Sequence, residues 1–490
     1  MPTDNCPDYT EYSRVFHEPG SGGPLNLPFQ RPVEACRRFT SKVIETVVDT
    51  VSAKMADLDL ARLFTNAYPN TLDTTIQQTA CLNSTDCQPL SYIITGDIDA
   101  MWLRDSANQL LPYLEHIKTD VSLKRLFLGA IYIQSQFINV DPFANAFHKP
   151  QSMQGQDISK RELKQGVYEN KWEVDSLASF LSLSTQYWET TGDDSFAGSQ
   201  DWMTAVDNVI QTLQHMQEPT FDPVTGRPRP VYNAYTHWTD RPTETQFLNG
   251  QGNPVNGTGM IKVLFRPSDD ATIFPFFIPG NAMISVELQR ASKLVALRNS
   301  TQAKVMADLS KQIRDGIYQH GVRDHPKYGK VFAYEVDGYG SALFMDDANV
   351  PSLLSLSLLG FVDQDDPIYQ NTRRLVLSRD NPYYFDGPRQ GGMAGIGGPH
   401  VAINYPWPMS QIVRILSSSD DNEIKEALEM LKRTTDGTGL IHESVNIYDD
   451  GKCHSKYTRP WFAWANALFG QAILKLSRER PHLIFKKEHA

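Results

Sequence analysis

The sequence predicts an all-α fold in which helices form a closed ring, and three observations lead to this prediction. Apolar residues recur at helical spacing in about twelve segments, whereas strand-like runs are few. Long polar or glycine-rich loops alternate along the chain with short, plain loops, and six of the polar loops run directly into a helix. Helices joined by short connections pack antiparallel, so alternate helix entries lie at the same end of the fold. Six helix pairs in a toroid would therefore gather all six polar loops at one end.

The individual helices are placed by apolar stripes that repeat with the period of an α-helix. In the stretch ITGDIDAMWLRDSANQL, for example, the stripe contains Leu103, Ala107 and Leu110. The six predicted helices that follow a polar loop span residues 100–117, 171–191, 274–297, 348–360, 406–417 and 460–476, and the remaining six span residues 32–54, 121–139, 201–217, 301–318, 366–378 and 421–433.

Other parts of the chain have little regular structure. The better strand-like runs, at residues 262–266 and 330–336, are short, and we expect them in hairpins within loops. Residues 1–31 are rich in Pro and Gly and lack periodicity, which predicts an N-terminal arm. No break in composition divides the rest, so we expect residues 32–490 to form a single domain.

Composition excludes several functional classes. The chain has 490 residues and a net charge of −11, and its basic residues are scattered, which argues against nucleic acid or an anionic membrane as a partner. It has no basic cluster or glycine-rich phosphate loop, so phosphorylated substrates are not favoured. No run approaches the roughly 18 uninterrupted apolar residues of a transmembrane helix. We expect a monomer.

Cysteines and glycosylation sequons point to the secretory route. Cys81 and Cys87 bracket a short loop that a disulfide could close, and Cys6 and Cys36 could form a second bridge, which leaves Cys453 over. The N-terminus has no apolar signal core, so we interpret the sequence as a mature secreted chain with an added start Met. A cytosolic protein with five free thiols is the alternative. The sequon asparagines are Asn83, Asn256 and Asn299.

The entry of the predicted helix 100–117 carries an unusual amount of charge. Asp99, Trp102 and the adjacent pair Arg104–Asp105 precede or begin a helix whose other positions are apolar. Taken alone, such an aspartate is most often a helix cap or a partner of the helix dipole. Six polar helix entries at one end of a toroid favour another interpretation, in which this charge forms the floor of a pocket for a polar ligand.

The stretch FRPSDDATIFPFF contains a candidate proton donor. Asp269 could cap the following helix and leave Asp270 against the phenylalanines, where desolvation would raise the pKa of its carboxyl. Arg266 could pair with one of the two aspartates and separate their roles. The alternative is an ordinary capped helix with an Arg–Asp pair on the surface.

The stretch GLIHESVNIYDD contains a candidate base. Glu443 could act as a general base or as a nucleophile, with His442 orienting the ligand, although a solvated loop glutamate is the commoner case. Indole rings can stack on the apolar faces of sugars, and several tryptophans lie in or beside the polar loops. For some of them, Trp464 in particular, packing in the core is the alternative. The tryptophans in question are at positions 102, 172, 407, 461 and 464.

No metal signature occurs in the sequence. There is no HExxH, no CxxC pair and no EF-hand spacing. The acidic run MDDAN at 345–349 is similar to diphosphate–magnesium motifs, but a second motif and a basic patch are missing. We therefore expect neither a metal nor a cofactor.

Long motifs of this sequence resemble those of glycoside hydrolase family 125, which comprises exo-acting α-1,6-mannosidases. The motifs are GDIDAMWLRDSANQ, KWEVDS, FRPSDDA, MDDANVPSLL, GIGGPH and HESVN, and the resemblance runs from about Cys36 to Leu476. It implies an (α/α)6 barrel, a single pocket for a non-reducing-end mannose, no metal, and inversion at the anomeric carbon. It also implies that Asp270 is the general acid, with Asp269 as the alternative, and that Glu443 is the general base.

The resemblance further implies a substrate and a set of groups that bind it. The substrate would be α-1,6-linked mannose oligosaccharides or mannan, and the arm and sequons are similar to those of a secreted fungal member. Trp172 stands where Tyr is familiar and Gly398 where Ser is familiar, which affects subsite details. The expected substrate-binding residues are Asp99, Trp102, Arg104, Asp105, Glu173, Arg266, Asp269, His400, Trp407 and His442.

Two other functions are compatible with a helical toroid. Sugar epimerases and isomerases use histidines as acid and base groups, but only His400 and His442 stand out in these carboxylate-rich loops. A non-catalytic mannan-binding protein would keep the tryptophans and tolerate the loss of either proposed catalytic carboxyl.

Overall fold

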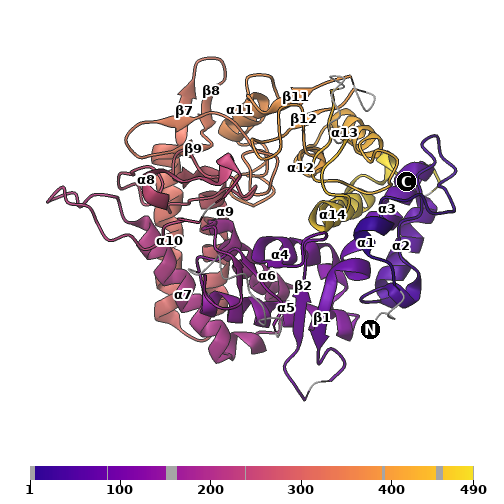
Figure 1. The fold of residues 1–490 in the computed structure, drawn as a ribbon, viewed down its shortest axis with the longest axis horizontal. Helices are drawn as coiled ribbons and strands as arrows, with labels where there is room; N and C mark the ends of the chain where they lie inside the picture. Colours follow the sequence, from indigo (N-terminus) through magenta and orange to yellow (C-terminus); the bar gives the residue numbers. More distant parts are fainter. Residues whose placement is uncertain are drawn as a thin grey trace.

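The computed structural model describes residues 6–84, 86–150, 163–237, 239–388, 392–448 and 456–488. Its helices form two concentric rings (Figure 1), as the sequence predicts. In chain order, the first inner helix contacts the second, the second contacts the third, and the fourth contacts the fifth, which in turn contacts the first. Residues 348–360 stand in the sequence between the third and the fourth inner helix. The inner helices are α4 (Leu103–Leu110), α6 (Val174–Thr191), α9 (Ile278–Val295), α12 (Pro408–Leu416) and α14 (Ala463–Glu479).

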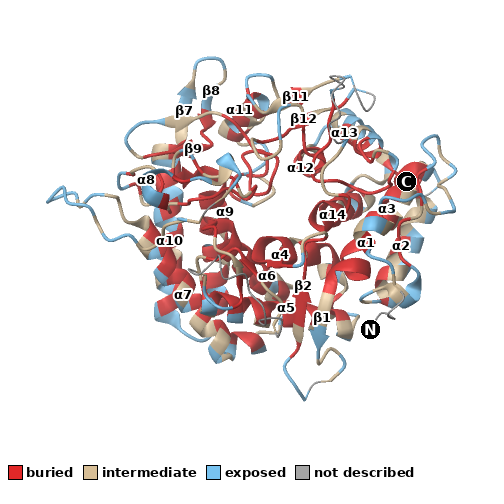
Figure 2. Ribbon diagram, viewed as in Figure 1, coloured by how far each residue is buried: buried red, intermediate tan, exposed pale blue. Residues whose placement is uncertain are grey.

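The outer helices cover the inner ring and present one face to solvent (Figure 2). Each of α5, α7, α10 and α13 lies next in the chain to an inner helix, and α3 packs on α14, the last inner helix. The outer helices are α2 (Lys42–Lys54), α3 (Leu58–Ala67), α5 (Val121–Val140), α7 (Gln200–Gln217), α10 (Ser300–Gly316), α11 (Pro367–Val376) and α13 (Asp421–Arg433).

The two rings differ in how their helices begin. Every outer helix named above has a Ser, Asp or Asn at its N-cap whose side chain accepts a backbone N–H, as Asp57 does from Leu60 and Asp120 from Leu123. None of the five inner helices has a side-chain cap. Their N-cap residues are Trp102, Glu173, Phe277, Trp407 and Phe462. The inner helix entries therefore keep N–H groups and positive dipole ends available at one end of the ring.

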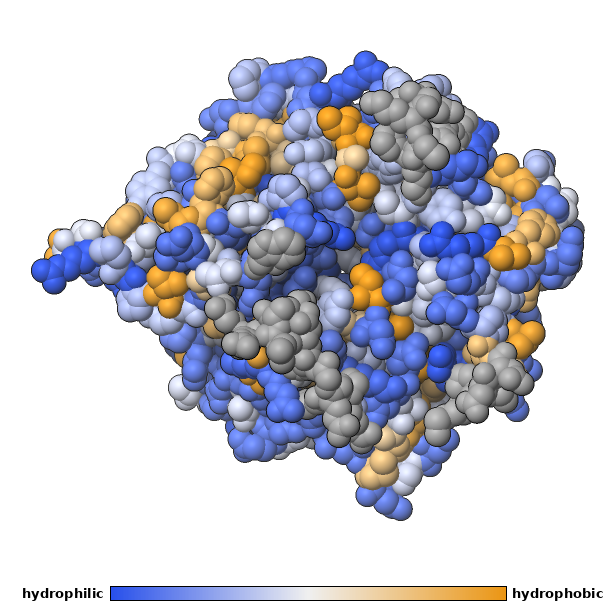
Figure 3. Space-filling view, in the orientation of Figure 1, coloured by the Kyte–Doolittle hydropathy of each residue, from blue (hydrophilic) through white to orange (hydrophobic). Residues whose placement is uncertain are grey.

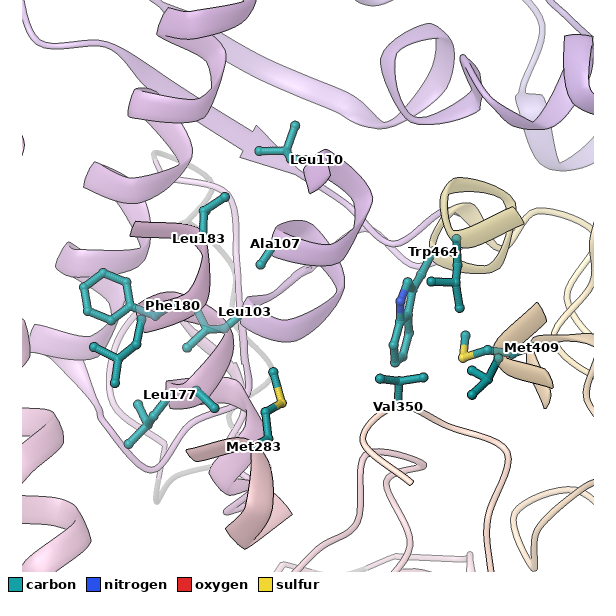
Figure 4. Close-up of a cluster of buried hydrophobic side chains, with 14 of the residues drawn as sticks. Leu103, Ala107, Leu110, Leu177, Phe180, Leu183, Met283, Val350, Met409 and Trp464 are labelled. Carbon is teal, nitrogen blue, oxygen red and sulfur yellow. The ribbon is translucent and has the colours of Figure 1, made fainter. Parts of the chain in front are cut away.

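The core lies between the rings and along the inner helices. Leu103, Ala107 and Leu110 of α4 point towards Leu177 and the following apolar residues of α6 (Figure 4), so the stripe predicted for this helix is confirmed. The helix itself is shorter than predicted, because it begins after strand β3 (Met101–Trp102) and continues from residue 111 as a 3-10 helix.

Most predicted helices form with their ends shifted by a few residues, but two predictions need correction. Residues 348–360 are turns, although they occupy the sixth inner position and pack on α11, where the Tyr369 hydroxyl donates to the Leu354 carbonyl at 2.7 Å. The carboxylate of Asp346 accepts the N–H groups of Leu353 and Leu354, and most of the following backbone bonds are of the i,i+3 type. The predicted helix 32–54 begins only at Lys42.

The strands are short and form small separate sheets. The run 330–336 forms β8 (Gly329–Phe332) and β9 (Glu335–Val336), as predicted, whereas 262–266 is not a strand because its N–H groups bond to isolated carbonyls such as that of Trp172. The remaining strands are β1 (Ile76–Ala80) paired with β2 (Leu90–Ile93), β4 (Ala146–Phe147) between β3 and β5 (Val167–Glu169), β6 (Phe276–Phe277) and β10 (Ala342–Leu343) on either side of β9, β7 (Val322–His325) paired with β8, and β11 (Tyr384–Asp386) paired with β12 (Ala394–Ile396).

Both predicted disulfides are present, between Cys6 and Cys36 and between Cys81 and Cys87. Cys453 lies outside the described residues. The N-terminal arm, described from residue 6, contains the short helix α1 (Tyr9–Tyr12) and lies against the ring where it closes. Across the described ranges, no helix is both long and apolar enough to cross a membrane.

Candidate active site

A cavity lies where the inner helices begin. On the face shown in Figure 3, hydrophilic side chains surround a hollow at the centre of the ring. The N-cap residues Trp102, Trp407 and Phe462 all line this cavity, so the uncapped helix entries converge on it. The full set of lining residues is Thr95, Ile98, Trp102, Arg104, Asp105, Pro267, Ser268, Asp269, Asn349, His400, Trp407, Glu443, Arg459, Phe462 and Trp464.

Arg104, in the first turn of α4, is at the centre of a buried ion cluster. Its Nη1 atom lies 2.6 Å from Oε2 of Glu173 and 3.0 Å from Oδ2 of Asp175, and its Nη2 atom lies 3.2 Å from Asp105. All four side chains are at most 5% exposed. One guanidinium thus faces three carboxyl groups, and burial raises the pKa of each of these carboxyls.

Asp269 projects from the opposite wall toward this cluster. Its backbone has a φ of +67°, a left-handed conformation that turns the side chain away from that of its neighbour. Asn145 donates to both Glu173 and Asp269, at 3.3 and 3.5 Å. Burial disfavours the ionised form of Asp269, but the charges of Lys171 and Arg104 outweigh burial and lower its pKa to about 2.

Glu173 and Asp269 share a hydrogen bond, and their pKa values move in opposite directions. Burial raises the pKa of Glu173 well above its usual value, and the nearby charge of Asp269 adds to this effect. A proton shared by this pair is therefore favoured on Glu173 over Asp269.

Asp270 lies behind the wall and contacts His400. Its Oδ1 atom is 3.3 Å from Nδ1 of His400, and the Ser268 hydroxyl donates to its other oxygen at 3.2 Å. Burial alone would lower the pKa of His400, but the hydrogen bond with Asp270 and the negative charges of Asp270 and Glu443 raise it to about 9. The imidazole on the cavity wall is therefore a cation at neutral pH.

Glu443 occupies the wall formed by the last part of the chain. The Thr458 hydroxyl donates to its Oε2 atom at 2.9 Å, and Nη1 of Arg459 lies 3.8 Å from Oε1. Arg459 is itself held by Asp97, with an Nη2–Oδ1 distance of 2.6 Å. The carboxylate is thus oriented by two groups and leaves Oε1 without a short hydrogen bond from the described residues.

Three indoles on the wall have free donors. The Nε1 atoms of Trp102, Trp407 and Trp464 are buried and have no hydrogen-bond partner among the described residues. A buried donor without a partner costs free energy, so such groups indicate a ligand that accepts hydrogen bonds. Aromatic faces beside free N–H groups, carboxylates and guanidinium groups are suited to a polyhydroxylated ring.

Most of the residues predicted for the site lie on this one cavity. Trp102, Arg104, Asp105, Asp269, His400, Trp407 and Glu443 line it, and Glu173 lies directly behind Arg104.

The structure does not place four other predicted residues on the cavity wall. Arg266 does not pair with either aspartate of its own stretch, because its side chain bonds to Glu335 at 2.6 Å. His442 is fully buried, and its ring nitrogens face backbone carbonyls and the Thr438 hydroxyl. Asp270 lies behind the wall, and Asp99 lines a neighbouring cavity.

Several lining residues were not predicted as site residues. Arg459 belongs to a polar loop recognised in the sequence, but nothing there distinguishes it from other loop arginines, and Asn349 follows the acidic run MDDAN. Trp464 lines the cavity although its predicted position was the core, and Trp172 is in the core, where its Nε1 donates to the Lys262 carbonyl at 2.6 Å. The other lining residues that were missed are Thr95, Ile98, Pro267, Ser268 and Phe462.

Comparison with known proteins gives the family. The sequence pattern of the metal-independent α-mannosidase family GH125 matches residues 57–474, which is most of the chain. The chain belongs to glycoside hydrolase family 125. The arm precedes the matched region, and the cavity described above lies within it.

Two relatives support this family assignment. The α-mannosidase chain is 48% identical to the meiotically up-regulated gene 157 protein of Schizosaccharomyces pombe, over 99% of this chain and 95% of that protein. A metal-independent α-mannosidase of Streptococcus pneumoniae, solved as a non-productive complex with α-1,6-mannobiose, superimposes with a TM-score of 0.80 at 31% identity, covering 90% of this chain and 100% of the other. The (α/α)6 fold is therefore confirmed for this α-mannosidase. In the part of the chain that the structure describes, no three His, Cys, Asp or Glu residues are arranged to hold a metal ion.

Proposed function

We propose that this α-mannosidase releases single mannose residues from the non-reducing ends of α-1,6-linked mannosides, with inversion at the anomeric carbon. One observation carries the proposal: Asp269 and Glu443, 174 positions apart in the chain, line the same cavity among unpartnered hydrogen-bond donors. The structural relative holds α-1,6-mannobiose, which supports this linkage.

The proton donor of this mechanism is Asp269. The sequence alone favoured Asp270, but Asp270 is committed to His400, whereas Asp269 faces the cavity. In this mechanism the hydrogen-bonded Glu173, whose pKa is raised by burial, holds the proton that the reaction needs, and Asp269, whose pKa is lowered by Lys171 and Arg104, accepts and passes it on. As the bond from C1 to the glycosidic oxygen breaks, Asp269 passes this proton to the departing oxygen and Glu173 replaces it.

The base of this mechanism is Glu443. Its ionised carboxylate removes a proton from a water molecule, and the water oxygen attacks C1 from the face opposite to the departing oxygen. This arrangement requires room for the water, which corresponds to carboxyl groups about 6.5–9.5 Å apart, whereas about 5–5.5 Å would produce a covalent intermediate and retention. Arg459 and Thr458 fix the carboxylate so that its free oxygen can take the proton.

The mannose ring lies, in this proposal, between the ion cluster and the indoles. Arg104 donates to ring hydroxyls and Asp105 accepts from them, while the indole N–H groups of Trp102, Trp407 and Trp464 supply further donors. Ala107 and Leu110, which follow Arg104 in α4, are buried in the core (Figure 4), and in this proposal they close the floor of the cavity. A cavity with a filled floor accepts a chain end and excludes cleavage within a chain.

The first test is hydrolysis of α-1,6-mannobiose followed by proton NMR. We expect β-mannose to appear first and mutarotate to α-mannose, and prior appearance of α-mannose would contradict inversion.

Asp269→Asn and Glu443→Gln should each lower kcat by about 10²-fold or more while the fold is kept. Asp420→Asn, at the exposed N-cap of α13, is the matched control and should leave kcat unchanged. A protein that binds the disaccharide without cleaving it would be a mannan-binding protein.

A second substrate distinguishes the roles of Asp269 and Asp270. A dinitrophenyl α-mannoside has a leaving group that needs no proton, so loss of the proton donor should matter little for it. Asp269→Asn should then keep most of its activity on this substrate, whereas Asp270→Asn should lose a similar share on both substrates. The opposite pattern would indicate that Asp270 is the proton donor.

We also propose that the enzyme follows the secretory route. The two disulfides support this, and so does the exposure of all three sequon asparagines, Asn83, Asn256 and Asn299. Enzyme purified from its own cells should lose mass when treated with an N-glycan-removing enzyme. An unchanged mass together with free thiols would contradict the proposal.

A further inference from the structure

A second cavity lies between the N-terminal arm and the ring, and we call it the arm cavity. Its volume is about 480 Å³, within the range typical of ligand sites. The arm and the residues that follow it, 32–38, supply one side of it, and the segments 73–77, 94–99 and Trp461 supply the other. The lining residues are Cys6, Pro7, Asp8, Tyr9, Thr10, Tyr12, Pro32, Cys36, Arg38, Asp73, Thr74, Gln77, Ile94, Gly96, Asp97, Asp99 and Trp461.

The arm is fixed in place, so the arm cavity is preformed. The Cys6–Cys36 disulfide closes the arm on itself. The hydroxyl of Tyr9 donates to the Gln30 carbonyl at 2.8 Å, and its ring packs edge-on against Trp461 with centroids 5.1 Å apart. Arg31, at the end of the arm, is ion-paired with the buried Asp73 at 2.7 Å. Few side chains must become ordered when a ligand binds to such a site.

The chemistry of the arm cavity is that of a site for a neutral, hydroxyl-rich ligand. Tyr9, Tyr12 and Trp461 give it an aromatic side, and Arg38, Gln77 and Asp99 give it polar side chains. None of these three polar side chains makes a hydrogen bond or ion pair within the described residues, so all three are available to a ligand. Two of the four lining carboxylates are already neutralised, because Asp73 pairs with Arg31 and Asp97 with Arg459. Asp8 and Asp99 then stand against the cation Arg38, a near balance of charge that suits a neutral ligand.

One layer of backbone separates the arm cavity from the active site. Gly96 forms an antiparallel bridge with Phe462, and the Ala463 N–H donates to the Thr95 carbonyl at 3.0 Å. Side chains alternate across this layer: Thr95 and Phe462 line the active site, whereas Ile94 and Trp461 line the arm cavity.

The edge of this layer carries lining residues of both cavities in direct succession. Ile98 lines the active-site cavity, and its neighbours Asp97 and Asp99 line the arm cavity, with Asp99 exposed to solvent. A glycan that extended from the active site to the arm cavity would pass Ile98. The GH125 match begins at residue 57, so the arm side of this cavity lies outside the family pattern.

We propose that the arm cavity is a distal glycan-binding site, which holds mannose residues on the reducing-end side of the linkage that is cleaved. The inference rests on the proposed function, because it assigns the second site to the same substrate. It makes the enzyme select longer α-1,6-linked chains over the disaccharide, through KM and not through kcat.

The test compares linear α-1,6-linked mannose di-, tri- and tetrasaccharides as substrates. We expect the KM of the wild-type enzyme to fall at least about fivefold from the disaccharide to the tetrasaccharide. The double variant Arg38→Ala/Gln77→Ala should show the disaccharide KM for all three lengths, with unchanged kinetics on the disaccharide. Arg14→Ala is the matched control, since it removes an exposed arginine of the arm that does not line the cavity.

A binding measurement covers the case in which the double variant is poorly folded. Calorimetry with the Glu443→Gln enzyme should show tighter binding of the tetrasaccharide than of the disaccharide, and an added Gln77→Ala should remove the difference. Equal KM at all lengths in the wild type, or a length preference that survives in the double variant, would overturn the proposal. If no mannoside is hydrolysed at all, it is the proposed function that fails, whereas disaccharide hydrolysis without length dependence is a failure of the distal site alone.

Discussion

Nδ1 of His400, on the wall of the active site, lies 3.3 Å from Oδ1 of Asp270, the neighbour of Asp269 in the chain. The two adjacent aspartates therefore have different partners: one faces the ligand cavity and the other holds an imidazole in its charged form. We infer that Asp270 acts through His400, as a positioning residue.

The first prediction concerns the charge of His400. Asp270→Asn removes the hydrogen-bonded carboxylate, so the pKa of His400 should fall from about 9 towards or below its ordinary value near 6.5, because burial then dominates. NMR titration of the histidine ring signals measures this directly. Asp420→Asn serves as the control and should leave the titration unchanged, and a His400 that still titrates near 9 in Asp270→Asn would refute the pairing.

The same pair makes a contribution to stability that depends on pH. The pKa of His400 is raised in the folded state, so this contribution is complete below about pH 6.5 and is lost as the pH rises towards 9. Its upper limit is about 3 kcal/mol. The difference in free energy of unfolding between wild type and Asp270→Asn should therefore shrink between pH 6.5 and pH 9, which denaturant titrations at several pH values can measure.

The second prediction concerns Glu173 as the holder of the catalytic proton. Glu173→Gln keeps the shape and a hydrogen-bond donor for Asp269, but it cannot release a proton to it. We expect kcat on α-1,6-mannobiose to fall by about 10²-fold or more, with a smaller change on the dinitrophenyl α-mannoside. The descending alkaline limb of the kcat profile, which reports loss of the Glu173 proton, should also disappear.

Glu287→Gln provides the comparison for this variant. Glu287 is also a buried glutamate whose pKa is raised by burial, and it pairs with Arg290 at 3.1 Å away from the cavity. The Glu287→Gln variant should change the stability of the enzyme without altering the ratio of its activity on α-1,6-mannobiose to its activity on the dinitrophenyl α-mannoside. A parallel loss on both substrates in Glu173→Gln would mean that Glu173 only positions Arg104.

The third prediction concerns the backbone layer between the two cavities. At Gly96 the φ angle is +134°, and an added Cβ would lie 2.2 Å from the carbonyl oxygen of Trp461. Gly96→Ala should therefore combine backbone strain of about 1 to 3 kcal/mol with overpacking of similar size. Thermal unfolding should show a clear loss of stability, and activity should fall because Phe462 and Arg459 are displaced.

Gly192→Ala isolates the strain from the overpacking. Gly192 ends α6 with a φ of +72°, and no atom lies within 4 Å of its added Cβ. This variant should lose only about 1 to 2 kcal/mol and keep its activity. Equal losses in the two variants would show that the close approach at Gly96 has no energetic consequence.

The fold was predictable because its signal is local. Helical stripes such as Leu103–Ala107–Leu110 define each helix separately, and the alternation of plain and polar loops defines which ends gather together. The turns at residues 348–360 were not predicted. They form where the Asp346 carboxylate, seven and eight positions earlier in the chain, accepts the N–H groups of Leu353 and Leu354. The helix propensities of these residues do not reveal that side-chain contact.

The site was predictable at the level of loops and less so at the level of side chains. Polar helix entries identified Trp102, Asp269 and Glu443 because those loops stand out by composition. The choice between adjacent Asp269 and Asp270 depends on one positive φ angle, and sequence carries no clear signal for it here. Arg266 lies off the cavity because it pairs with Glu335, 69 positions away, which only the folded ring brings near. His442 lies off the cavity because Thr435, Thr438 and Arg459 enclose its ring, and the sequence does not show which way the ring points.

The closure of the ring by α14 has a consequence during synthesis of the enzyme. Asp269 leaves the ribosome well before Glu443, Arg459 and Trp464, which belong to the last segments to be synthesised. A nascent or prematurely terminated chain thus lacks one of the two proposed catalytic carboxyls, whatever part of it has folded. The cavity is complete only when α14, the last helix of the chain, lies beside α4, the first inner helix.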